Sequence, residues 1–371
     1  MTVVIDLVAG ARPNFVKLAP VLRALDREGR LHTRVVHTGQ HYDFNMNEVF
    51  FQQLGIRNPD VHLGVGAGTQ GAQTARILER YEAHLVDRRP GGTVVFGDVN
   101  STVACALAAV KLGVPVAHVE AGLRSFDRSM PEEINRVLTD AISDLLLVSE
   151  PSGVENLRSE GISGRRVELV GNVMIDTLMS ELEVVPRDGL EAFGLTEGGY
   201  ALLTMHRPSN VDHPEVLAGL VELLVELSGE ILLVFAVHPR TRRALEQSRL
   251  WDRLAGVEGI RLLEPCPYRD MLLLMRSARL LLTDSGGMQE ETAVLGTPCL
   301  TMRDNTERPV TLELGTSELV GNDPERIRDA FARVMSGGCK TGQNIPMWDG
   351  RSGERVARAL ERWMTDGGTG A

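Results

Sequence analysis

The stretch LLLTDSGGMQEE, Leu280–Glu291, predicts how this chain folds, because it joins an apolar run to a polar turn and then to the start of a helix. The run LLLT shows no alternation, which is typical of a strand buried on both faces of a parallel sheet. Gly286 and Gly287 leave backbone N–H groups bare at the turn, where the dipole of the following helix favours an anion. Glu290 and Glu291 lie about one helical turn further on. The stretch therefore predicts a strand–turn–helix unit that brings carboxylates close to an anion site.

The same alternation of strand and helix runs along the whole chain. Apolar runs predict strands at 3–10, 33–39, 93–98, 114–120, 145–149 and 167–171 in the first half, and at 200–206, 231–239, 260–265, 280–285, 298–303 and 317–321 in the second. Amphipathic stretches lie between them, a repetition that requires right-handed crossovers and doubly wound sheets. Twelve strands are too many for one such sheet. The sequence therefore predicts an α/β fold with two six-stranded Rossmann-type domains.

The stretch VVPRDGLEAFGLTEGG, at 184–199, carries the Pro and Gly residues of a linker. We therefore place an N-terminal domain at 1–183 and a C-terminal domain at 184–351. A last helix, predicted within 352–371, follows a long polar segment and is free to pack on either domain.

The length, composition and charge of the chain indicate which classes of protein it fits and which they exclude. The 371 residues fit about two domains, and the contents of 43% apolar and 24% charged residues are those of an ordinary globular protein. The N-terminus lacks the features of a signal peptide, and no apolar segment approaches the ~20 residues that span a bilayer. We therefore expect a cytoplasmic protein without membrane association. The four cysteines are far apart, which argues against disulfides or a zinc knuckle. The net charge of −11 argues against nucleic-acid binding.

Charged side chains follow the predicted strands of the first half, and ligands of open α/β sheets bind beyond the carboxyl ends of the strands. Arg12 and Lys17 follow the first strand, where paired cations near a helix N-terminus suit a diphosphate; alternatively, Lys17 is a solvated lysine. Asp98 and Glu120 end two successive strands. These carboxylates should project from the same edge of the sheet.

The motif MPEEINR, residues 130–136, opens a further helix, on which Glu132 and Arg136 share a face. A surface ion pair explains these two residues equally well. If Glu132 lies close to Asp98 and Glu120, a purely structural role is harder to accept for these three acids. Clustered carboxylates repel one another unless a ligand, a cation or a proton offsets their charge. Such clusters supply general acids and bases at neutral pH.

Two histidines end strands in the second half. His206 and His238 are followed by arginines, and a titratable imidazole is useful at a strand end. No HExxH motif or His/Cys cluster occurs, so no metal is expected. In the opening stretch, the turn at Ser285 suits a phosphate, and a following carboxylate suits the hydroxyls of an attached ribose. A nucleoside diphosphate fits both features.

The chain resembles the non-hydrolysing UDP-N-acetylglucosamine 2-epimerase family. The similarity runs, in order, through GARPNFVK, TGQHYD, GDVNST, HVEAGLRS, MPEEINR, GNVMID, MHRPSN, TDSGGMQEE and LGTPCLTMRDNTERP, and covers residues 10 to about 321. The resemblance implies a GT-B-like fold, in which two Rossmann-type domains face each other across a cleft and the last helix returns to the N-terminal domain. It also implies a UDP-sugar substrate, a homodimer, and chemistry that needs neither nicotinamide nor metal.

The resemblance also implies roles for individual residues. The catalytic residues would be Asp98, Glu120, Glu132 and His206, and the substrate-binding residues would be Arg12, Lys17, Arg136, His238, Ser285, Gly286, Gly287, Glu291 and Arg308. UDP would bind mainly to the second domain, with its phosphates at the glycine turn and its ribose at Glu291. Removal of the C2 proton with anti expulsion of UDP would leave 2-acetamidoglucal, and re-addition of UDP with reprotonation on the other face would invert C2.

Some positions depart from the family pattern. Ser209 and Val310 stand where glutamate is frequent. Many bacterial members bind a second UDP-sugar through two glutamines of the loop that corresponds to TGQHYD, residues 38–43, which we call the QH loop. Gln40 is present here, but Asp43 occupies the second position. We therefore expect no such allosteric activation.

Four alternatives stay open: an epimerase of a UDP-diacetamido-uronic acid, a hydrolysing 2-epimerase that releases N-acetylmannosamine, a GT-B glycosyltransferase and a non-catalytic UDP-sugar sensor. The sequence HVEAGLR disfavours the hydrolysing relatives, which typically carry Gly-Gly-Glu there. A transferase or a sensor would leave the three acids unexplained.

Overall fold

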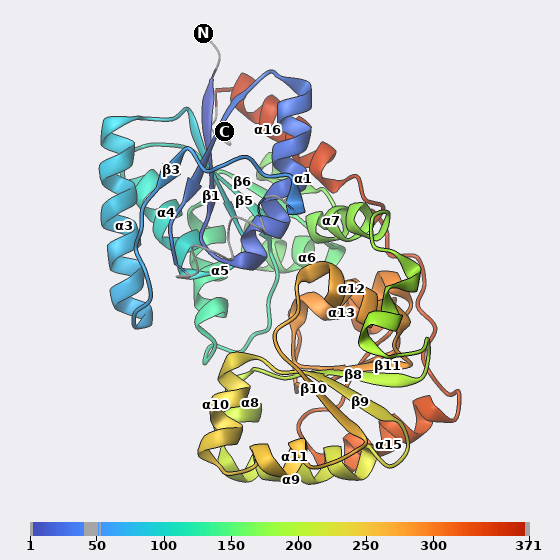
Figure 1. Ribbon diagram of the computed structural model, residues 1–371. Coiled ribbons are helices and arrows are strands. Elements are labelled where there is room, and N and C mark those ends of the chain that lie inside the picture. Colours follow the sequence, from blue (N-terminus) through green and yellow to red (C-terminus); the bar gives the residue numbers. More distant parts are fainter. Residues whose placement is uncertain (1–2, 41–50, 52, 368–371) are drawn as a thin grey trace. The chain divides into compact units, whose positions relative to one another are not determined.

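The computed structural model of the protein describes residues 3–40, 51 and 53–367, and the chain divides into two compact units (Figure 1). Unit 1 comprises residues 1–177 and 346–371, and unit 2 comprises residues 178–345. The division falls within helix α7 (Val173–Leu182), ahead of the linker indicated by the sequence. Unit 2 is thus inserted into unit 1 along the chain.

Unit 1 is built on a parallel sheet with the strand order β3-β2-β1-β4-β5-β6-β7. Its strands are β1 (Val4–Ala9), β2 (His32–His37), β3 (Val61–His62), β4 (Gly92–Phe96), β5 (Val116–Ala121), β6 (Leu145–Val148) and β7 (Val167–Leu169). The predicted number of six strands was wrong, because the short β3 contains one apolar residue and shows no periodicity. Every residue of β4 and β5 is buried, as parallel strands covered on both faces require.

Helices cover both faces of this sheet (Figure 1). They are α1 (Arg12–Glu28), α3 (Gln70–Asp87), α4 (Asn100–Lys111), α5 (Pro131–Ile142), α6 (Pro151–Ser159), the 3₁₀ turn η1 (Gly164–Arg166), the first part of α7, and α16 (Ser352–Thr365). A core of β1, β4, α3 and α4 side chains forms one layer; it includes Val8, Val95, Ile77 and Ala104.

Unit 2 repeats the arrangement with the strand order β10-β9-β8-β11-β12-β13, again all parallel. Its strands are β8 (Tyr200–Thr204), β9 (Leu232–Ala236), β10 (Ile260–Leu263), β11 (Leu280–Thr283), β12 (Cys299–Thr301) and β13 (Ser317–Leu319). Its helices are η2 (Arg187–Phe193), α8 (Pro208–Val211), α9 (Pro214–Leu227), α10 (Pro239–Gln247), α11 (Trp251–Ala255), α12 (Tyr268–Ser277), α13 (Gly286–Leu295), α14 (Pro309–Glu313) and α15 (Pro324–Met335). The prediction of two Rossmann-type doubly wound units is confirmed.

The strand order of each sheet indicates where a ligand would bind. The chain order reverses between β1 and β4 in unit 1 and between β8 and β11 in unit 2. Ligands of open α/β sheets bind beyond the carboxyl ends of the strands at this switch point. The segments that carry the predicted site residues follow these strands.

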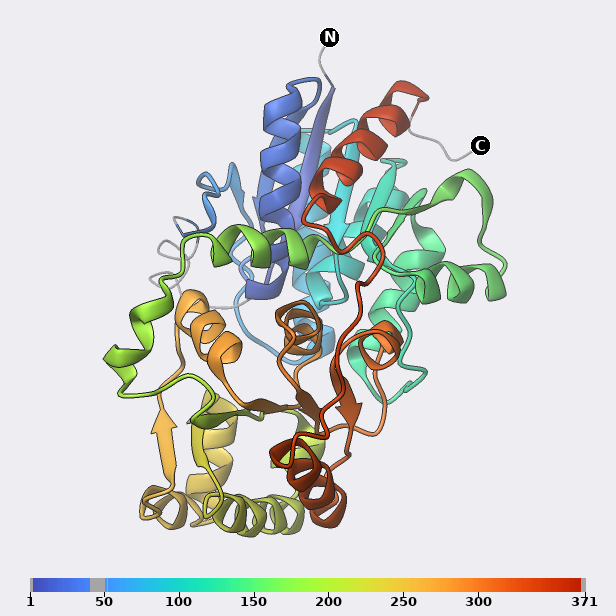
Figure 2. The same ribbon diagram turned by 90° about the vertical axis from the view of Figure 1, so that its right-hand side faces the viewer.

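The last helix, α16, packs beside α1 in unit 1 (Figure 2). Its buried face includes Val356, Leu360 and Trp363. The two helices approach so closely that a side chain at Gly353 would lie 2.7 Å from the carbonyl oxygen of Pro20. Asp176 in α7 fixes the start of α16, because its carboxylate accepts the N–H groups of Ser352 at 3.0 Å and Gly353 at 2.6 Å.

We expect Asp176→Ala to lower the stability of unit 1 by about 1 kcal/mol, the usual cost of a lost helix cap. Hydrogen–deuterium exchange should become faster in α16 and in the face of α1 beneath it. Asp176→Asn keeps one acceptor oxygen and should have a smaller effect. Unchanged exchange in α16 of the alanine variant would show that Asp176 does not hold this helix.

Candidate functional site

At the carboxyl edge of the unit 1 sheet, the predicted charged residues lie in the first turns of α1, in the loop after β4, at the end of β5 and in α5. Arg12 is the first residue of α1 and is exposed, whereas Lys17, one and a half turns later, is buried. Glu120 is buried in β5, and Asp98 is half-buried after β4. Glu132, also half-buried, lies in the first turn of α5.

Glu120 has an unusual backbone. Its φ is +74°, and the register of β5 against β6 shifts between Val119 and Ala121, so Glu120 is the extra residue of a bulge. A left-handed conformation is costly for a residue with a side chain and is retained mainly where the surroundings enforce it, often at functional sites. The Glu120 carboxylate, only 7% exposed, forms an ion pair with the ammonium of Lys17. The interpretation of Lys17 as a solvated lysine was wrong.

Arg136 joins two carboxylates on the same edge. Its guanidinium pairs with Asp98 and, at 2.8 Å, with Glu133. Glu133 in turn accepts the N–H groups of Ser125 and Phe126, each at 2.9 Å, which fixes the loop between β5 and α5. Arg136 is buried, so the interpretation of this residue as half of a surface ion pair was wrong.

Gln40, the last described residue before the gap at 41–50, has a structural role in unit 1. Its side-chain oxygen accepts the backbone N–H of Ser101 at 3.1 Å and the Ser101 hydroxyl at 2.7 Å, and thereby caps the start of α4. Gln73 donates to the Gln40 carbonyl oxygen at 3.1 Å. Asp43 lies outside the described residues.

In unit 2 the predicted phosphate turn lies at the N-terminus of α13. Ser285 is the residue before the helix, and Gly286 and Gly287 form its first two positions, so their N–H groups have no acceptor within the helix. A side chain at Gly286 would lie 2.6 Å from the Arg308 guanidinium, which shows how closely this cation approaches the turn. A helix N-terminus next to an arginine is a position that favours an anion.

The two glutamates after the glycines have different surroundings. Glu290 pairs with Nε of Arg308 at 2.7 Å, and Glu307 contacts Nη1 of the same guanidinium. Glu291 accepts a hydrogen bond from the Tyr268 hydroxyl at 2.7 Å. Glu290 therefore orients the arginine, and Glu291 is held at the start of α12.

His206 is oriented by a buried carboxylate. Asp284, fully buried after β11, lies 2.8 Å from Nδ1 of His206 and also accepts the backbone N–H groups of His206 and Arg207. Burial opposes ionisation of Asp284, but these bonds and the charge of His206 outweigh it and lower its pKa. The pairing leaves Nε2 as the ring nitrogen that faces away from the carboxylate.

The ring of His238 lies 5.3 Å from that of His206. His238 caps α10, because its Nδ1 accepts the N–H of Arg240 at 3.2 Å. Burial, and then the neighbouring charge of His206, lower the pKa of His238. Two of the arginines that follow it are engaged in ion pairs, Arg240 with Asp212 and Arg242 with Glu264.

Sequence reasoning missed three residues that build these sites: Glu133, Asp284 as the partner of His206, and Tyr268. The spacing of Glu133 three residues before Arg136 could have indicated its pairing, since that spacing also places two residues on one helix face. No pattern in the sequence indicates the contact of Tyr268 with Glu291.

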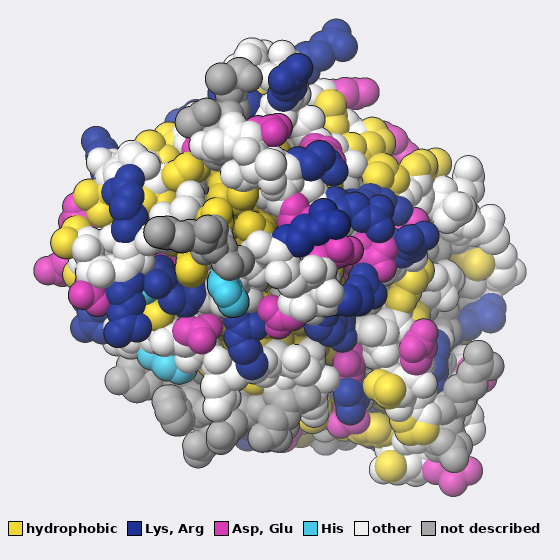
Figure 3. Space-filling view, turned by 90° about the horizontal axis from the view of Figure 1, so that it is seen from above, with side chains coloured by type: hydrophobic (Ala, Val, Ile, Leu, Met, Phe, Trp, Pro, Cys, Tyr) yellow, Lys and Arg dark blue, Asp and Glu magenta, His cyan; other side chains and the backbone are white. Residues whose placement is uncertain are grey.

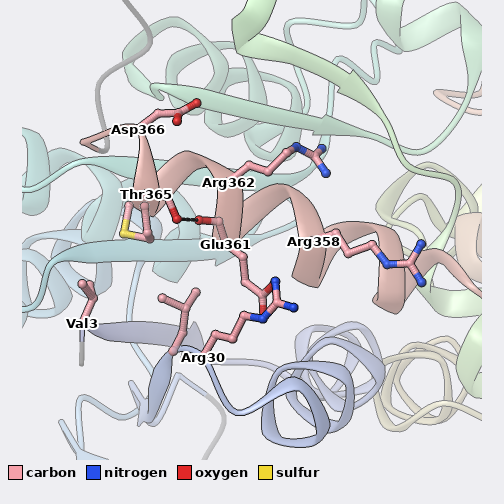
Figure 4. Close-up of a pocket in the computed structure, with 9 residues that line it drawn as sticks. Val3, Arg30, Arg358, Glu361, Arg362, Thr365 and Asp366 are labelled. Carbon is pink, nitrogen blue, oxygen red and sulfur yellow. Dashed lines mark hydrogen bonds and ion pairs between the residues drawn. The ribbon is translucent and has the colours of Figure 1, made fainter. Parts of the chain in front are cut away.

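A pocket lined by Val3, Arg30, Leu31, Arg358, Glu361, Arg362, Met364, Thr365 and Asp366 lies at α16 (Figure 4). Val3 and Leu31 directly precede β1 and β2, so this pocket lies at the amino edge of the sheet, away from the predicted acids. Arg30 pairs with Glu361 at 3.3 Å, and Arg362 pairs with Glu168 at 2.5 Å. We do not count this pocket as part of the candidate site.

Other classes of site receive no support from the described residues. On the face in Figure 3, the coloured Lys and Arg side chains lie among Asp and Glu side chains rather than in an extended basic surface. Within 3–40, 51 and 53–367, no group of three or more His, Cys, Asp or Glu side chains is placed to hold a metal ion. Over the same ranges, no helix is long and apolar enough to cross a membrane.

Comparison with known proteins places this chain among epimerases. A family model described as UDP-N-acetylglucosamine 2-epimerase matches residues 23–361. A Methanocaldococcus jannaschii protein named UDP-N-acetylglucosamine 2-epimerase is 42% identical over 96% of this chain and 98% of its own length. A Pseudomonas aeruginosa protein named UDP-2,3-diacetamido-2,3-dideoxy-D-glucuronate 2-epimerase is 39% identical over 96% of this chain and 98% of its own length.

Among solved structures, the M. jannaschii enzyme in complex with UDP-GlcNAc and UDP resembles this chain with a TM-score of 0.90 and 41% identity, covering 97% of this chain and 99% of its own. The similarity therefore extends over both Rossmann-type units.

We expect Asp284→Asn to lower the stability of unit 2 at pH 7 by roughly 1–3 kcal/mol, because an amide cannot accept all the bonds that the carboxylate accepts. The lowered pKa of Asp284 means that its ionised form stabilises the fold, and this contribution is lost as the pH falls through that pKa. The difference between the two proteins should therefore shrink as the pH falls below about 4.

The measurement is urea unfolding followed by the fluorescence of Trp251 in a Trp348→Phe, Trp363→Phe background, since Trp251 is then the one tryptophan left in the chain. The control is Asp212→Asn, which removes a half-exposed ion pair of small expected value. A loss of stability that stays constant from pH 7 to pH 3 would contradict the assigned role of the charge.

Proposed function

Because the chain belongs to the UDP-N-acetylglucosamine 2-epimerase family, we propose that it interconverts UDP-N-acetylglucosamine and UDP-N-acetylmannosamine by inverting C2 of the sugar. The observation that carries the proposal is the buried, left-handed Glu120, paired with Lys17 at the same sheet edge as Asp98. A strained, buried carboxylate with a cation beside it is costly for folding alone. An enzyme that moves a proton to and from carbon needs such a group.

In this proposal unit 2 holds the UDP group. The phosphates would accept the N–H groups of Gly286 and Gly287 and the Ser285 hydroxyl, with the Arg308 guanidinium beside them. Two buried donors close to Arg308, Nε2 of Gln289 and Nη1 of Arg303, have no hydrogen-bond partner among the described residues, which supports the binding of an oxygen-rich ligand here.

The remaining contacts to UDP would come from three side chains. Glu291, oriented by Tyr268, would accept the hydroxyls of the ribose. Arg12, exposed at the start of α1, would approach the diphosphate together with His206, whose ring is fixed by Asp284.

The proposed reaction proceeds by elimination and re-addition. A carboxylate takes the C2 proton, the electron pair of that C–H bond forms the C1–C2 double bond, and the C1–oxygen bond breaks to release UDP, leaving 2-acetamidoglucal. UDP then re-adds at C1 while a proton is delivered to the opposite face of C2. Negative charge grows on the leaving phosphate, where arginine and N–H donors stabilise the transition state more than the substrate.

Inversion requires proton-handling groups on both faces of C2, which is why one carboxylate is insufficient. Asp98, Glu120 and Glu132 supply these groups in the proposal. Lys17 and Arg136 would hold two of them in fixed positions, since Lys17 contacts Glu120 and Arg136 contacts Asp98.

A second candidate substrate is favoured by one comparison. The P. aeruginosa relative, at 39% identity, is named for a diacetamido-glucuronate sugar, and its similarity to this chain is close to that of the M. jannaschii protein. Substituents at C3 and C6 of the sugar are read by few side chains, so the same C2 chemistry serves both substrates.

Homodimerisation and a cytoplasmic location stay predictions from the family resemblance.

The test is incubation with UDP-N-acetylglucosamine in deuterated water, followed by NMR. We expect deuterium at C2 and the appearance of UDP-N-acetylmannosamine. Free N-acetylmannosamine would indicate the hydrolysing reaction instead. An unchanged sugar, together with turnover of the diacetamido-uronic substrate, would assign the second candidate. No exchange with either sugar would contradict epimerase activity and favour a transferase or a sensor.

Asp98→Asn and Glu120→Gln should each reduce C2 exchange by at least about 100-fold, the usual scale of a lost acid or base. Binding of UDP, measured by calorimetry, should change little because in this proposal UDP is held mainly by unit 2 and neither acid contacts it. Normal turnover by either variant would exclude that residue from the proton transfer, and a parallel loss of UDP binding would point to a structural defect.

A further inference from the structure

A buried charge network in unit 1 lies next to the predicted acids but takes no part in the reaction proposed above. His118 is fully buried in β5, two residues before Glu120, and its Nδ1 lies 2.7 Å from Oδ1 of Asp140 in α5. Nε2 of His118 lies 2.8 Å from the carbonyl oxygen of Gly97. The other oxygen of Asp140 accepts the N–H of Gly122 at 3.0 Å and Nη1 of Arg124 at 2.7 Å.

The charge states of the network follow from its contacts. A carbonyl oxygen only accepts, so Nε2 of His118 carries a proton. Burial opposes the ionisation of Asp140, but the hydrogen bonds and charges of His118 and Arg124 outweigh it and lower the pKa of Asp140. Nδ1 of His118 lies within hydrogen-bond distance of the Asp140 carboxylate, so the imidazole links that carboxylate to the Gly97 carbonyl. Arg124 is balanced at its outer end by two bonds to Glu160.

The contacts of this network flank Glu120 on both sides in the chain and reach the residue before Asp98. Asp140 binds His118 and Gly122, the residues two before and two after Glu120, so one carboxylate fixes both ends of the left-handed segment. His118 also binds the carbonyl of Gly97, the residue before Asp98. The Gly97 N–H donates to the Val119 carbonyl at 3.0 Å, which joins the ends of β4 and β5 a second time.

The backbone at Glu120 needs such support, because its φ of +74° is costly for a residue with a side chain. Gly97 and Gly122, with φ values of +64° and +81°, adopt such angles without that cost. A buried network of this kind seldom adds stability over a well-packed apolar core. A displacement of about 1 Å at a reacting group, in contrast, costs about 100-fold in rate.

We infer that Asp140 and His118 are positioning residues, which hold Glu120 and Asp98 in the geometry required for proton transfer at the sugar C2. The inference rests on the proposed function. The acids touch the substrate, and the network acts through them.

The test compares Asp140→Asn with Asp6→Asn. An amide at 140 cannot accept from His118, Gly122 and Arg124 together. Asp6 is a matched control, because it is also fully buried in this sheet and also binds an imidazole and a guanidinium, His84 at 3.0 Å and Arg34 at 2.7 Å, but lies in the middle of β1. Both variants lose a buried carboxylate, so a purely structural role would affect them alike.

For Asp140→Asn we expect a decrease in kcat for C2 deuterium exchange of about 100-fold, with KM for UDP-N-acetylglucosamine and UDP affinity nearly unchanged. Backbone hydrogen exchange should become faster at 97–98 and 120–122. Asp6→Asn should keep kcat and show its faster exchange elsewhere. If Asp140→Asn does not fold, His118→Gln carries the same expectation, since it keeps a donor toward Gly97 and loses the bond to Asp140.

An unchanged kcat in Asp140→Asn, or an equal decrease in Asp6→Asn, would overturn the inference. If the unmodified protein exchanges no deuterium with any UDP-sugar tested, the proposed function fails. The backbone exchange at 97–98 and 120–122 then still decides the positioning role, because faster exchange there in Asp140→Asn alone supports it and its absence refutes it.

Discussion

The structure depends on one constraint, which is that parallel strands need a helical crossover between them. Each crossover returns the chain to the amino edge, so all carboxyl ends of a sheet and the N-termini of the following helices lie at the opposite edge. In unit 1 this constraint brings the residues after β1, β4 and β5 to one edge although they are far apart in the sequence. In unit 2 it brings the turn before α13 to the edge that also carries His206. Both sites are products of the fold rather than of local motifs.

The cations at these sheet edges are each held by one or two carboxylates. Arg136 is held between Asp98 and Glu133, Arg308 is held between Glu290 and Glu307, and Lys17 contacts Glu120. Side chains fixed in this way need little rearrangement when charge develops on a ligand, which is the condition for electrostatic stabilisation of a transition state. The net charge of −11 is compatible with handling an anionic ligand because the useful cations are concentrated and oriented.

Long apolar runs predicted the twelve main strands, since strands buried on both faces leave a clear signal in the sequence. β3 was missed because two residues without periodicity leave none. Strand ends predicted the positions of Asp98, Glu120 and His206. The conformation of Glu120 was beyond prediction, because a left-handed glutamate depends on its tertiary surroundings rather than on its own preference.

The partners of the site residues were the least predictable part. Adjacent glutamates occur in MPEEINR and in GGMQEE, and in each pair the structure gives the two residues different surroundings. Glu133 binds the loop ahead of α5, and Glu290 binds Arg308, a residue from another loop. Composition and spacing do not specify such tertiary contacts, since they depend on which helix face meets which loop.

The insertion of unit 2 into unit 1 has a consequence for biosynthesis. All of the strands and helices assigned wholly to unit 2 are continuous in the chain and leave the ribosome before α16. Unit 1 is completed by α16, whose start is fixed by Asp176 and whose apolar face covers α1. During translation the strands and helices of the second unit therefore emerge before the helix that covers α1, so α1 stays uncovered until the last part of the chain has been made.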